Sequence, residues 1–413
     1  MSRDVATRYA GRSLFRHARR TVLSILGIGV ASGLSLFMVA FVRGESQMML
    51  RAASESGIGH LRIIPRGWLD SRDNALRLPD WQDIRDRLRS HSEVGIITAH
   101  ARIEGLLAMG TRSTGVEIVG VDPNTEQQIN RLVRTVAEGR YLLAGDRGTT
   151  VVGRTVADRL DVTLDDALMV TVTDVHGQMQ GAMLRIVGIV ETGSRDLDST
   201  ICHVSLADVT ALSGSAGAGD VTLMLKAPRQ LEQSRKILSA DLPAGVSIVT
   251  WQDIMPEMAS AMKIDQTWTR LMIVIIMLVA FLGIASAQLA AVLERRREFA
   301  VLAALGMKNA RLVYVMLVEG VILGACGAGV GLLLGGGGAY YAATRGIDFG
   351  KFYGEGDWSM SNMLLDPVMY SDFGWWLIPL ACVLSLSATL LSSIYPAWYA
   401  ARTDPASALR VDH

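Results

Sequence analysis

The chain has 413 residues, half of them hydrophobic, and its 40 basic and 40 acidic residues give a formal net charge of zero. This balance averages over unlike segments, so it points neither to nucleic acid nor to any other charged partner. Cys326 and Cys382 lie in apolar runs and only Cys202 lies outside them, which excludes an intramolecular disulfide in the polar part of the chain.

Four uncharged runs predict four transmembrane helices. Each run is long enough to cross a hydrocarbon core of about 30 Å at about 1.5 Å per residue. The first run exceeds the roughly 7–15 residues of a signal-peptide core, and no clear small-residue cleavage site follows it, so we interpret it as a retained span. The runs are Thr21–Val42, Leu271–Leu293, Gly320–Thr344 and Phe373–Ala401.

The distribution of arginine predicts the orientation. Basic residues gather before the first run, between the second and third runs, and in the C-terminal tail, whereas the loop between the last two runs is acidic. By the positive-inside rule, both termini and the loop 294–312 lie in the cytoplasm and the long segment after the first run lies outside. The predicted segments are a cytoplasmic basic N-terminal helix at 1–20, spans at 21–43, 268–293, 313–344 and 373–397, an outer domain at 44–267, a charged cytoplasmic helix at 294–312, a short outer loop at 345–372 and a cytoplasmic tail at 398–413.

The outer segment alternates β-rich runs with polar helices. Pro79–His91 and Arg229–Leu242 have helical spacing and a charged face, and Leu206–Leu212 predicts a short third helix. Runs rich in β-branched residues predict strands, so we expect an α+β domain of two subdomains. The expected strands are His60–Pro65, Val116–Val121, Thr149–Gly153, Ala167–Thr173, Met183–Val190, Thr222–Lys226 and Ser247–Thr250.

Catalytic signatures are absent from the sequence. It contains no H-E-x-x-H, no G-x-S-x-G and no Cys/His cluster, and four histidines of the outer segment, His60, His100, His176 and His203, lack the spacing of metal ligands. It also lacks a G-x-x-x-x-G-K-[ST] phosphate loop. We therefore expect no catalytic site, metal or cofactor in this chain, and any ATP must be hydrolysed by a separate chain.

Glycines form a stripe along one face of the third span. Their spacings of 4, 3, 4 and 4 residues predict close packing against a neighbouring helix, with Gly27, Ala31 and Ser35 of the first span as candidate partners. The charged Glu319 beside them either snorkels to the interface, which we favour, or pairs with an arginine. The stripe consists of Gly320, Gly324, Gly327, Gly331 and Gly335.

Glu294–Gly306, with the sequence ERRREFAVLAALG, is the most informative segment. Five charged residues in a row cannot lie in lipid, so a helix here lies on a membrane face between two spans. Phe299, Leu302 and Gly306 share one helical face, which would be an apolar stripe in water. This favours docking of a soluble partner over the alternative, in which Arg295–Arg297 only anchor the span to lipid head groups.

The order of these segments resembles the bacterial ABC transporter permeases of the FtsX/MacB type. The likeness rests on Glu294–Gly335, on the tail YPAWYAARTDPASALR, and on GVDPNTEQQ, EGRYL, VVGRTVADRLDV and RIVGIVETGSRDLDSTICHVSLADVTALSG in the outer segment. Within the family, GSRDLDST and GIGHLRI are most similar to the lipoprotein-releasing LolC/LolE group. The resemblance implies an α-helical protein of the inner membrane with four transmembrane helices and a MacB-like α+β periplasmic domain.

The resemblance also implies partners and a function. A cytoplasmic ABC ATPase dimer would bind ATP and Mg and would dock on the coupling helix at 294–312. The other expected partners are a second permease copy or a paralogue, and a periplasmic lipoprotein carrier. The expected function is mechanotransmission-type extraction of lipoproteins, with MacB-like export of peptides or drugs and FtsX-like control of a periplasmic enzyme as alternatives. The residues expected to couple to the ATPase are Glu294, Arg297, Glu298, Phe299, Leu302 and Gly306.

Methionines near the outer ends of the first two spans suggest where cargo binds. Met38, Phe41, Met48 and Met272 would line an adaptable apolar cavity, because the methionine side chain is flexible and polarizable. Ordinary packing or contact with lipid is the equally weighted alternative.

Overall fold

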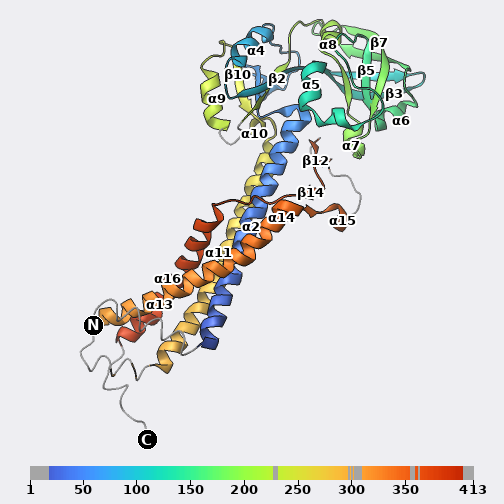
Figure 1. The fold of residues 1–413 in the computed structure, drawn as a ribbon. Coiled ribbons are helices and arrows are strands. Elements are labelled where there is room, and N and C mark those ends of the chain that lie inside the picture. Colours follow the sequence, from blue (N-terminus) through green and yellow to red (C-terminus); the bar gives the residue numbers. More distant parts are fainter. Residues whose placement is uncertain are drawn as a thin grey trace. The chain divides into compact units, whose positions relative to one another are not determined.

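The computed structural model describes residues 18–226, 231–295, 298, 301, 309–353, 359–360 and 363–402. The chain divides into two compact units (Figure 1). We call them the helical unit, formed by Met1–Ser46, Met262–Ile347 and Val368–His413, and the sheet unit, formed by Gln47–Ala261 and Asp348–Pro367.

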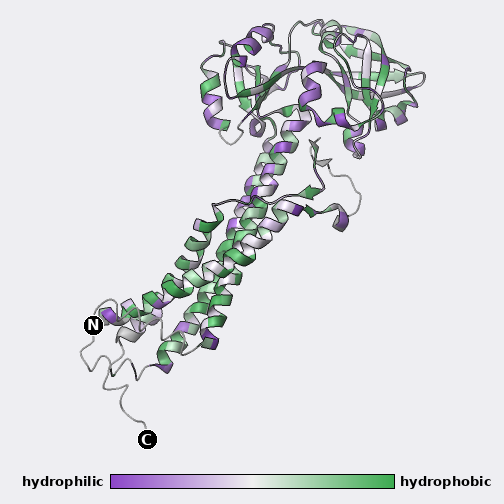
Figure 2. Ribbon diagram, in the orientation of Figure 1, coloured by the Kyte–Doolittle hydropathy of each residue, from purple (hydrophilic) through white to green (hydrophobic). Residues whose placement is uncertain are grey.

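Four long apolar helices make up the helical unit, as the sequence predicts. Each is long and apolar enough to cross a membrane, and Figure 2 shows that hydrophobic residues predominate along them. The third helix contains a π-helical turn, η4 (Leu332–Gly336), between its two α-helical parts. The helices are α2 (Ala18–Ala53), α11 (Pro256–Glu294), α13 (Asn309–Gly331) with α14 (Gly337–Arg345), and α16 (Leu377–Arg402).

The helices extend beyond the uncharged runs that predict them. Helix α2 continues to Ala53, ten residues past the predicted end of the span at 43, and α11 begins at Pro256 rather than at 268. Hydropathy marks the thickness of the bilayer and not the ends of a helix, and between Arg43 and Gly57 the sequence has no proline and Gly44 as its single glycine. Proline suits the first turn of α11, where no backbone donor is needed.

Most of the short loop expected at 345–372 belongs to the sheet unit, which includes Asp348–Pro367. Leu364 packs against a core cluster of that unit, and Arg131 forms an ion pair with Asp366. Its short elements are β11 (Ile347–Asp348), α15 (Gly350–Tyr353), β12 (Ser359–Met360), β13 (Met363–Leu364) and β14 (Val368–Met369).

The helices of the helical unit meet along an apolar centre. Ile28, Ile284, Leu323 and Ala388, one from each long helix, form a buried cluster. Helix α11 is the least covered, since only 6% of its most apolar window is buried and Val279 is 66% exposed. An apolar helix left this exposed must face lipid or another membrane-embedded chain.

The sheet unit is built on a ten-stranded sheet. Nine of its strands lie in the order β10-β1-β9-β2-β3-β8-β5-β7-β4. Strand β6 pairs with both β2 and β7, so β2, β3, β8, β5, β7 and β6 close a ring. The strands are β1 (Leu61–Pro65), β2 (Val94–Met109), β3 (Arg112–Val121), β4 (Val136–Gly139), β5 (Thr149–Gly153), β6 (Ala167–Thr173), β7 (Met179–Val190), β8 (Cys202–Ser205), β9 (Asp220–Leu225) and β10 (Val246–Thr250).

Two core clusters lie on the two parts of this sheet, and a third, which Leu364 contacts, includes Leu142 and Val151. The ring encloses one, with Leu107, Ile118, Leu168 and Leu184 almost fully buried, and the β10-β1-β9-β2 part carries the other. The two expected subdomains are therefore lobes that share the long strand β2. The helices are α3 (Trp68–Ser71), α4 (Trp81–Arg89), α5 (Pro123–Ile129), α6 (Arg154–Leu160), α7 (Arg195–Asp198), α8 (Leu206–Ser213), α9 (Leu231–Ser239) and α10 (Trp251–Ile254), with the turns η1 (Ser54–Ile58) and η2 (Arg131–Thr135).

Candidate functional site

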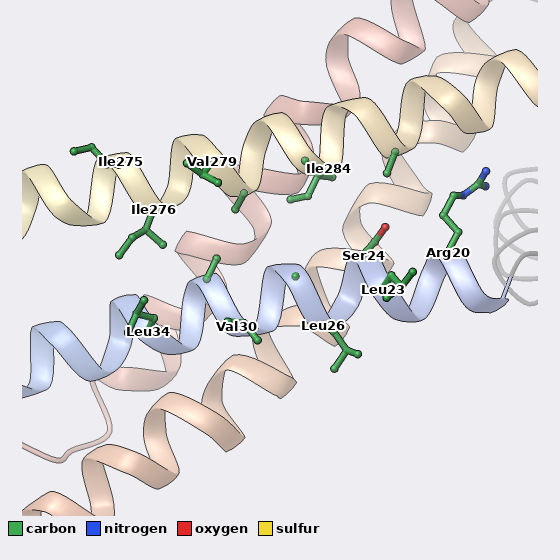
Figure 3. A pocket seen from close by; sticks show the side chains of 15 residues that line it. Arg20, Leu23, Ser24, Leu26, Val30, Leu34, Ile275, Ile276, Val279 and Ile284 are labelled. Atoms are coloured by element: carbon green, nitrogen blue, oxygen red, sulfur yellow. The ribbon is translucent and has the colours of Figure 1, made fainter.

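A large apolar groove lies between α2 and α11 (Figure 3). Its volume is about 860 Å³, and Arg20 and Ser24 are its only lining residues with polar side chains. Val30, Leu34 and Val279 on its walls are 55%, 53% and 66% exposed. Such a surface would be unfavourable in water, so the groove suits lipid or an acyl chain.

Small residues create the space. Gly27, Ala31, Gly283 and Ala287 line the groove, and a Cβ added at Gly27 or Gly283 would meet nothing within 4 Å. The spacing of Gly27 and Ala31 predicts a helix-packing face, but in the structure these residues open a groove instead. Sequence spacing identifies a face of small residues without showing whether a neighbouring helix fills it.

Ion pairs lie at one end of the groove, where α2 begins and α11 ends. Arg20 Nη1 lies 2.9 Å from Glu294 Oε2. Arg295, with a side chain only 7% exposed, pairs with Glu319 at 3.3 Å and with Glu298 at 3.4 Å. Our preference for a snorkelling Glu319 is therefore wrong: the end of α11 brings a buried arginine to it, and pairing offsets the cost of burying either charge.

The glycine stripe packs against two helices in turn. Added Cβ atoms at Gly320 and Gly324 would lie 2.6 and 2.5 Å from Ser393 and Thr389 of α16. Gly327, Gly331 and Gly335 instead face α2, through Ile28, Ser32 and Gly33. Of the predicted partners, Gly27 and Ala31 line the groove and do not face the stripe, whereas Ser35 is fully buried and does not line the groove.

A cluster of buried charges occupies the sheet unit. Asp220 at the start of β9 pairs with Arg102 of β2 and with Arg62 of β1, whose Nε lies 3.5 Å from Oδ1. His100 of β2 lies between two carboxylates, with Nδ1 3.4 Å from Asp220 and Nε2 2.8 Å from Glu126 of α5. The pairing of β2 and β9 places His100 directly opposite Asp220, so the sheet register itself assembles the cluster.

The pKa shifts of Asp220, Glu126 and His100 favour their charged forms. Burial opposes charge on Asp220, but Arg62 and Arg102 hold its pKa well below the usual range. Burial likewise opposes charge on Glu126, yet His100 lowers the Glu126 pKa to about 2. Burial lowers the pKa of His100, but Glu126 and Asp220 raise it by more, so the pKa of His100 lies above its usual value. The cluster thus holds two arginines and a readily protonated histidine against two carboxylates.

Comparison with protein-family models decides the family. The model of the MacB-like periplasmic core domain matches residues 21–240, more than half of the chain, and the model of the FtsX-like permease C-terminal region matches residues 270–405. This chain belongs to the FtsX/MacB-type ABC transporter permeases. The sheet unit is the periplasmic domain of this permease, and the helical unit carries its membrane helices.

Curated relatives cover almost the whole permease at low identity. The lipoprotein-releasing system transmembrane protein LolE of Haemophilus influenzae is 22% identical over 396 residues, which is 92% of each chain. The LolC protein of the same kind of system from Xylella fastidiosa is 22% identical over 95% of this chain and 94% of its own. The macrolide export ATP-binding/permease protein MacB of Brucella melitensis is 24% identical, over 84% of this chain and 55% of its own.

The predicted functional residues of the permease fall into two groups. Of the coupling residues, Glu294 and Glu298 take part in the ion pairs above, whereas Arg297, Phe299, Leu302 and Gly306 lie outside the described residues. The predicted cargo residues do not line the groove: Met38, Phe41 and Met48 are half-buried along the later part of α2, and Met272 is 38% exposed one turn before Ile275. Sequence reasoning missed the groove because its lining is chemically ordinary for a span.

The glycine seam yields the first prediction for this permease. In Gly335→Ala the new Cβ would lie 2.1 Å from the carbonyl oxygen of Gly33, a backbone atom that cannot move aside. We expect the helices to separate and the free energy of unfolding to fall by about 1–3 kcal/mol, the usual cost of overpacking. Thermal unfolding of the detergent-solubilised permease measures this.

Gly329→Ala is the matched control, because its Cβ would meet nothing within 4 Å and alanine favours the helix. Equal stability of the two variants would show that the seam is not closely packed.

Proposed function

We propose that this permease extracts lipoproteins or other lipidated cargo from the bacterial inner membrane toward the outer membrane. The groove between α2 and α11 carries the proposal, because its lining is apolar except for Arg20 and Ser24 and wall residues such as Val30 and Val279 are exposed at the surface of the helical unit. Whole-length similarity to LolE and LolC, whose names describe lipoprotein release, supports the same conclusion.

The energetics favour an amphiphilic cargo over a hydrophilic one. Each acyl CH₂ that remains buried contributes about 0.8 kcal/mol, so a cargo with several chains needs a large apolar surface along its route. Three buried hydroxyl groups of α16 do not offer a polar route, because Thr389, Ser392 and Ser393 donate to backbone carbonyls of their own helix. Ser393 and Thr389 fill the space beside Gly320 and Gly324.

ATP would act through a separate cytoplasmic ABC ATPase dimer that binds ATP and Mg. In this proposal the coupling helix at 294–312 docks on the ATPase through Phe299, Leu302 and Gly306, with Arg297 and Glu298 at the rim. The ion pairs of Arg20 with Glu294 and of Arg295 with Glu319 tie the base of this helix to α2 and α13. Movement of the coupling helix would therefore reach the helices that border the groove.

Two further partners belong to the proposal. The exposed face of α11 leaves room for a second permease copy or a paralogue beside the groove. A periplasmic lipoprotein carrier would receive the cargo at the sheet unit. The arginine distribution supports a cytoplasmic location for both termini in this proposal.

Photo-crosslinking in living cells tests the proposal. We expect crosslinkers at Val30 and Val279 in the groove, and at Met272 one turn away, to capture acylated protein. Capture should fall when the ATPase is active and a carrier is present, because cargo then leaves. The positions Phe41 and Met48 test whether cargo also contacts the later part of α2.

Val383 on α16 is the matched control, since it is an apolar membrane residue with 63% exposure that does not line the groove. Capture of a soluble peptide without acyl chains would favour MacB-like export instead. An empty groove in a complex with active ATPase would favour an FtsX-like signalling scaffold.

A further inference from the structure

A polar cavity of about 200 Å³ lies beside the charge cluster of the sheet unit. It is bordered by η1, β1, β2, β3, α5 and β8, and residues of η1 that follow α2 in the chain form part of its wall. Arg62, His100, Arg102 and His203 are among the residues that line it. The lipid-facing groove is elsewhere, in the helical unit, so this cavity is a distinct feature.

Arginine donors at the cavity exceed the acceptors that the described residues offer them. Arg62 is 4% exposed; its Nη2 donates to the Gly57 carbonyl at 3.1 Å, but its Nε makes no hydrogen bond and lies only within ion-pair distance of Asp220. Arg102 uses Nη1 for Asp220. A guanidinium carries five N–H donors, so both side chains retain unused donors where the cavity begins.

His203 contributes another donor. The hydroxyl of buried Tyr141 lies 2.7 Å from His203 Nδ1, and burial raises the Tyr141 pKa well above 10, which keeps the phenol protonated. Burial lowers the His203 pKa to about 4, which keeps the imidazole neutral. Since the described residues provide no other acceptor for the Tyr141 proton, Tyr141 donates to Nδ1 and the His203 proton resides on Nε2.

We propose that this cavity binds an anionic oxygen group, a carboxylate or phosphate, through Arg62, Arg102 and His203 Nε2–H. The carboxylates already in the cluster do not fill this role: Glu126 is held by His100 and Asn130, and Asp220 by the two arginines and His100. Glu117 is exposed at the rim of the cavity, and its negative charge repels a bound anion. It favours a singly charged group over a dianion.

The cavity is too small for an entire lipid or a folded segment, since drug-sized ligands need about 300–1,000 Å³. It therefore suits a small free anion or a single head group that reaches in from a larger molecule. This inference does not depend on lipoprotein release: a permease with any cargo would keep the cavity.

Rim charges provide the test, because they can change without disturbing the buried cluster. Glu117→Gln removes the opposing charge and should tighten binding of inorganic phosphate by about threefold to tenfold. Thr200 is exposed at the rim, so Thr200→Glu should weaken binding by a similar factor, whereas Thr200→Gln, of equal size, should weaken it much less. Isothermal titration of the full-length permease in lipid-free detergent, with phosphate as the probe, measures all three.

Asp83→Asn is the control for net charge, because Asp83 is exposed on α4 and does not line the cavity; its affinity should equal that of the wild type. A second titration with dihexanoyl phosphatidate separates the sources. If phosphate binds and its affinity changes as expected in the Glu117 and Thr200 variants, the ligand is a free anion. If only the short-chain lipid binds, with the same changes in affinity, the ligand is a lipid head group. No saturable binding of either probe, or affinity indifferent to Glu117 and Thr200, overturns the proposal.

Discussion

Asp220→Asn is expected to destabilise the sheet unit by about 3–5 kcal/mol, the cost of removing one partner from a buried ion pair. Asparagine keeps the shape of the side chain but leaves Arg62 and Arg102 without their shared counter-ion. His100 can release its proton to reduce the excess charge, but the arginines cannot. Against a typical domain stability of about 5–15 kcal/mol, this loss would expose much of the sheet unit to protease. Pulse proteolysis of the whole permease across a urea series measures the shift.

Glu191→Gln is the comparison, since Glu191 pairs with Arg154 at 3.5 Å while remaining 55% exposed. A surface pair of this kind contributes about 0–1 kcal/mol. If Asp220→Asn were as stable as Glu191→Gln, the cluster would not support the fold of the sheet unit.

Glu298→Lys combined with Leu302→Asp should abolish co-purification of the ATPase while the permease still inserts into the membrane. The aspartate places an uncompensated charge on the proposed apolar docking face, and the lysine reverses a rim charge. An unpaired charge at a buried contact costs several kcal/mol, which is enough to reduce affinity by a factor of about a hundred or more. The lysine also removes the partner of Arg295, but Glu319 remains to pair with it.

Leu143→Asp makes the same kind of substitution at an exposed leucine of the sheet unit, so it controls for added surface charge. It should leave ATPase binding intact. A complex of normal composition and activity in the Glu298→Lys, Leu302→Asp variant would rule out docking through this helix.

The sequence predicts those parts of the fold that depend on the composition of a single segment. Uncharged length identifies four membrane helices, and β-branched runs identify strands such as β6, which has the predicted bounds Ala167–Thr173. Strand β2 (Val94–Met109) was missed, although it is the strand that both lobes share. Its glycines, Gly95 and Gly105, and its alanines weaken the β pattern, and its stability comes from pairing with three neighbouring strands.

The candidate sites were harder to predict because they depend on which faces meet. On α2, the faces of Gly27 and of Gly33 look equally suited to packing, yet only the latter meets the glycine stripe and the former opens the groove. The charge cluster joins Arg62, His100 and Asp220, which are far apart in sequence and adjacent only through the strand order β1-β9-β2. No local spacing encodes such a contact.

Reconstitution tests the central claim, that this permease moves lipidated cargo, most directly. Proteoliposomes would contain the permease, its ATPase and a fluorescent lipoprotein in either acylated or acyl-free form, with the soluble carrier outside. The groove predicts ATP-dependent transfer of the acylated protein to the carrier and little transfer when Val279→Arg places a charge in the groove. ATP-dependent movement of the acyl-free form at an equal rate, or transfer unaffected by Val279→Arg, would contradict the account.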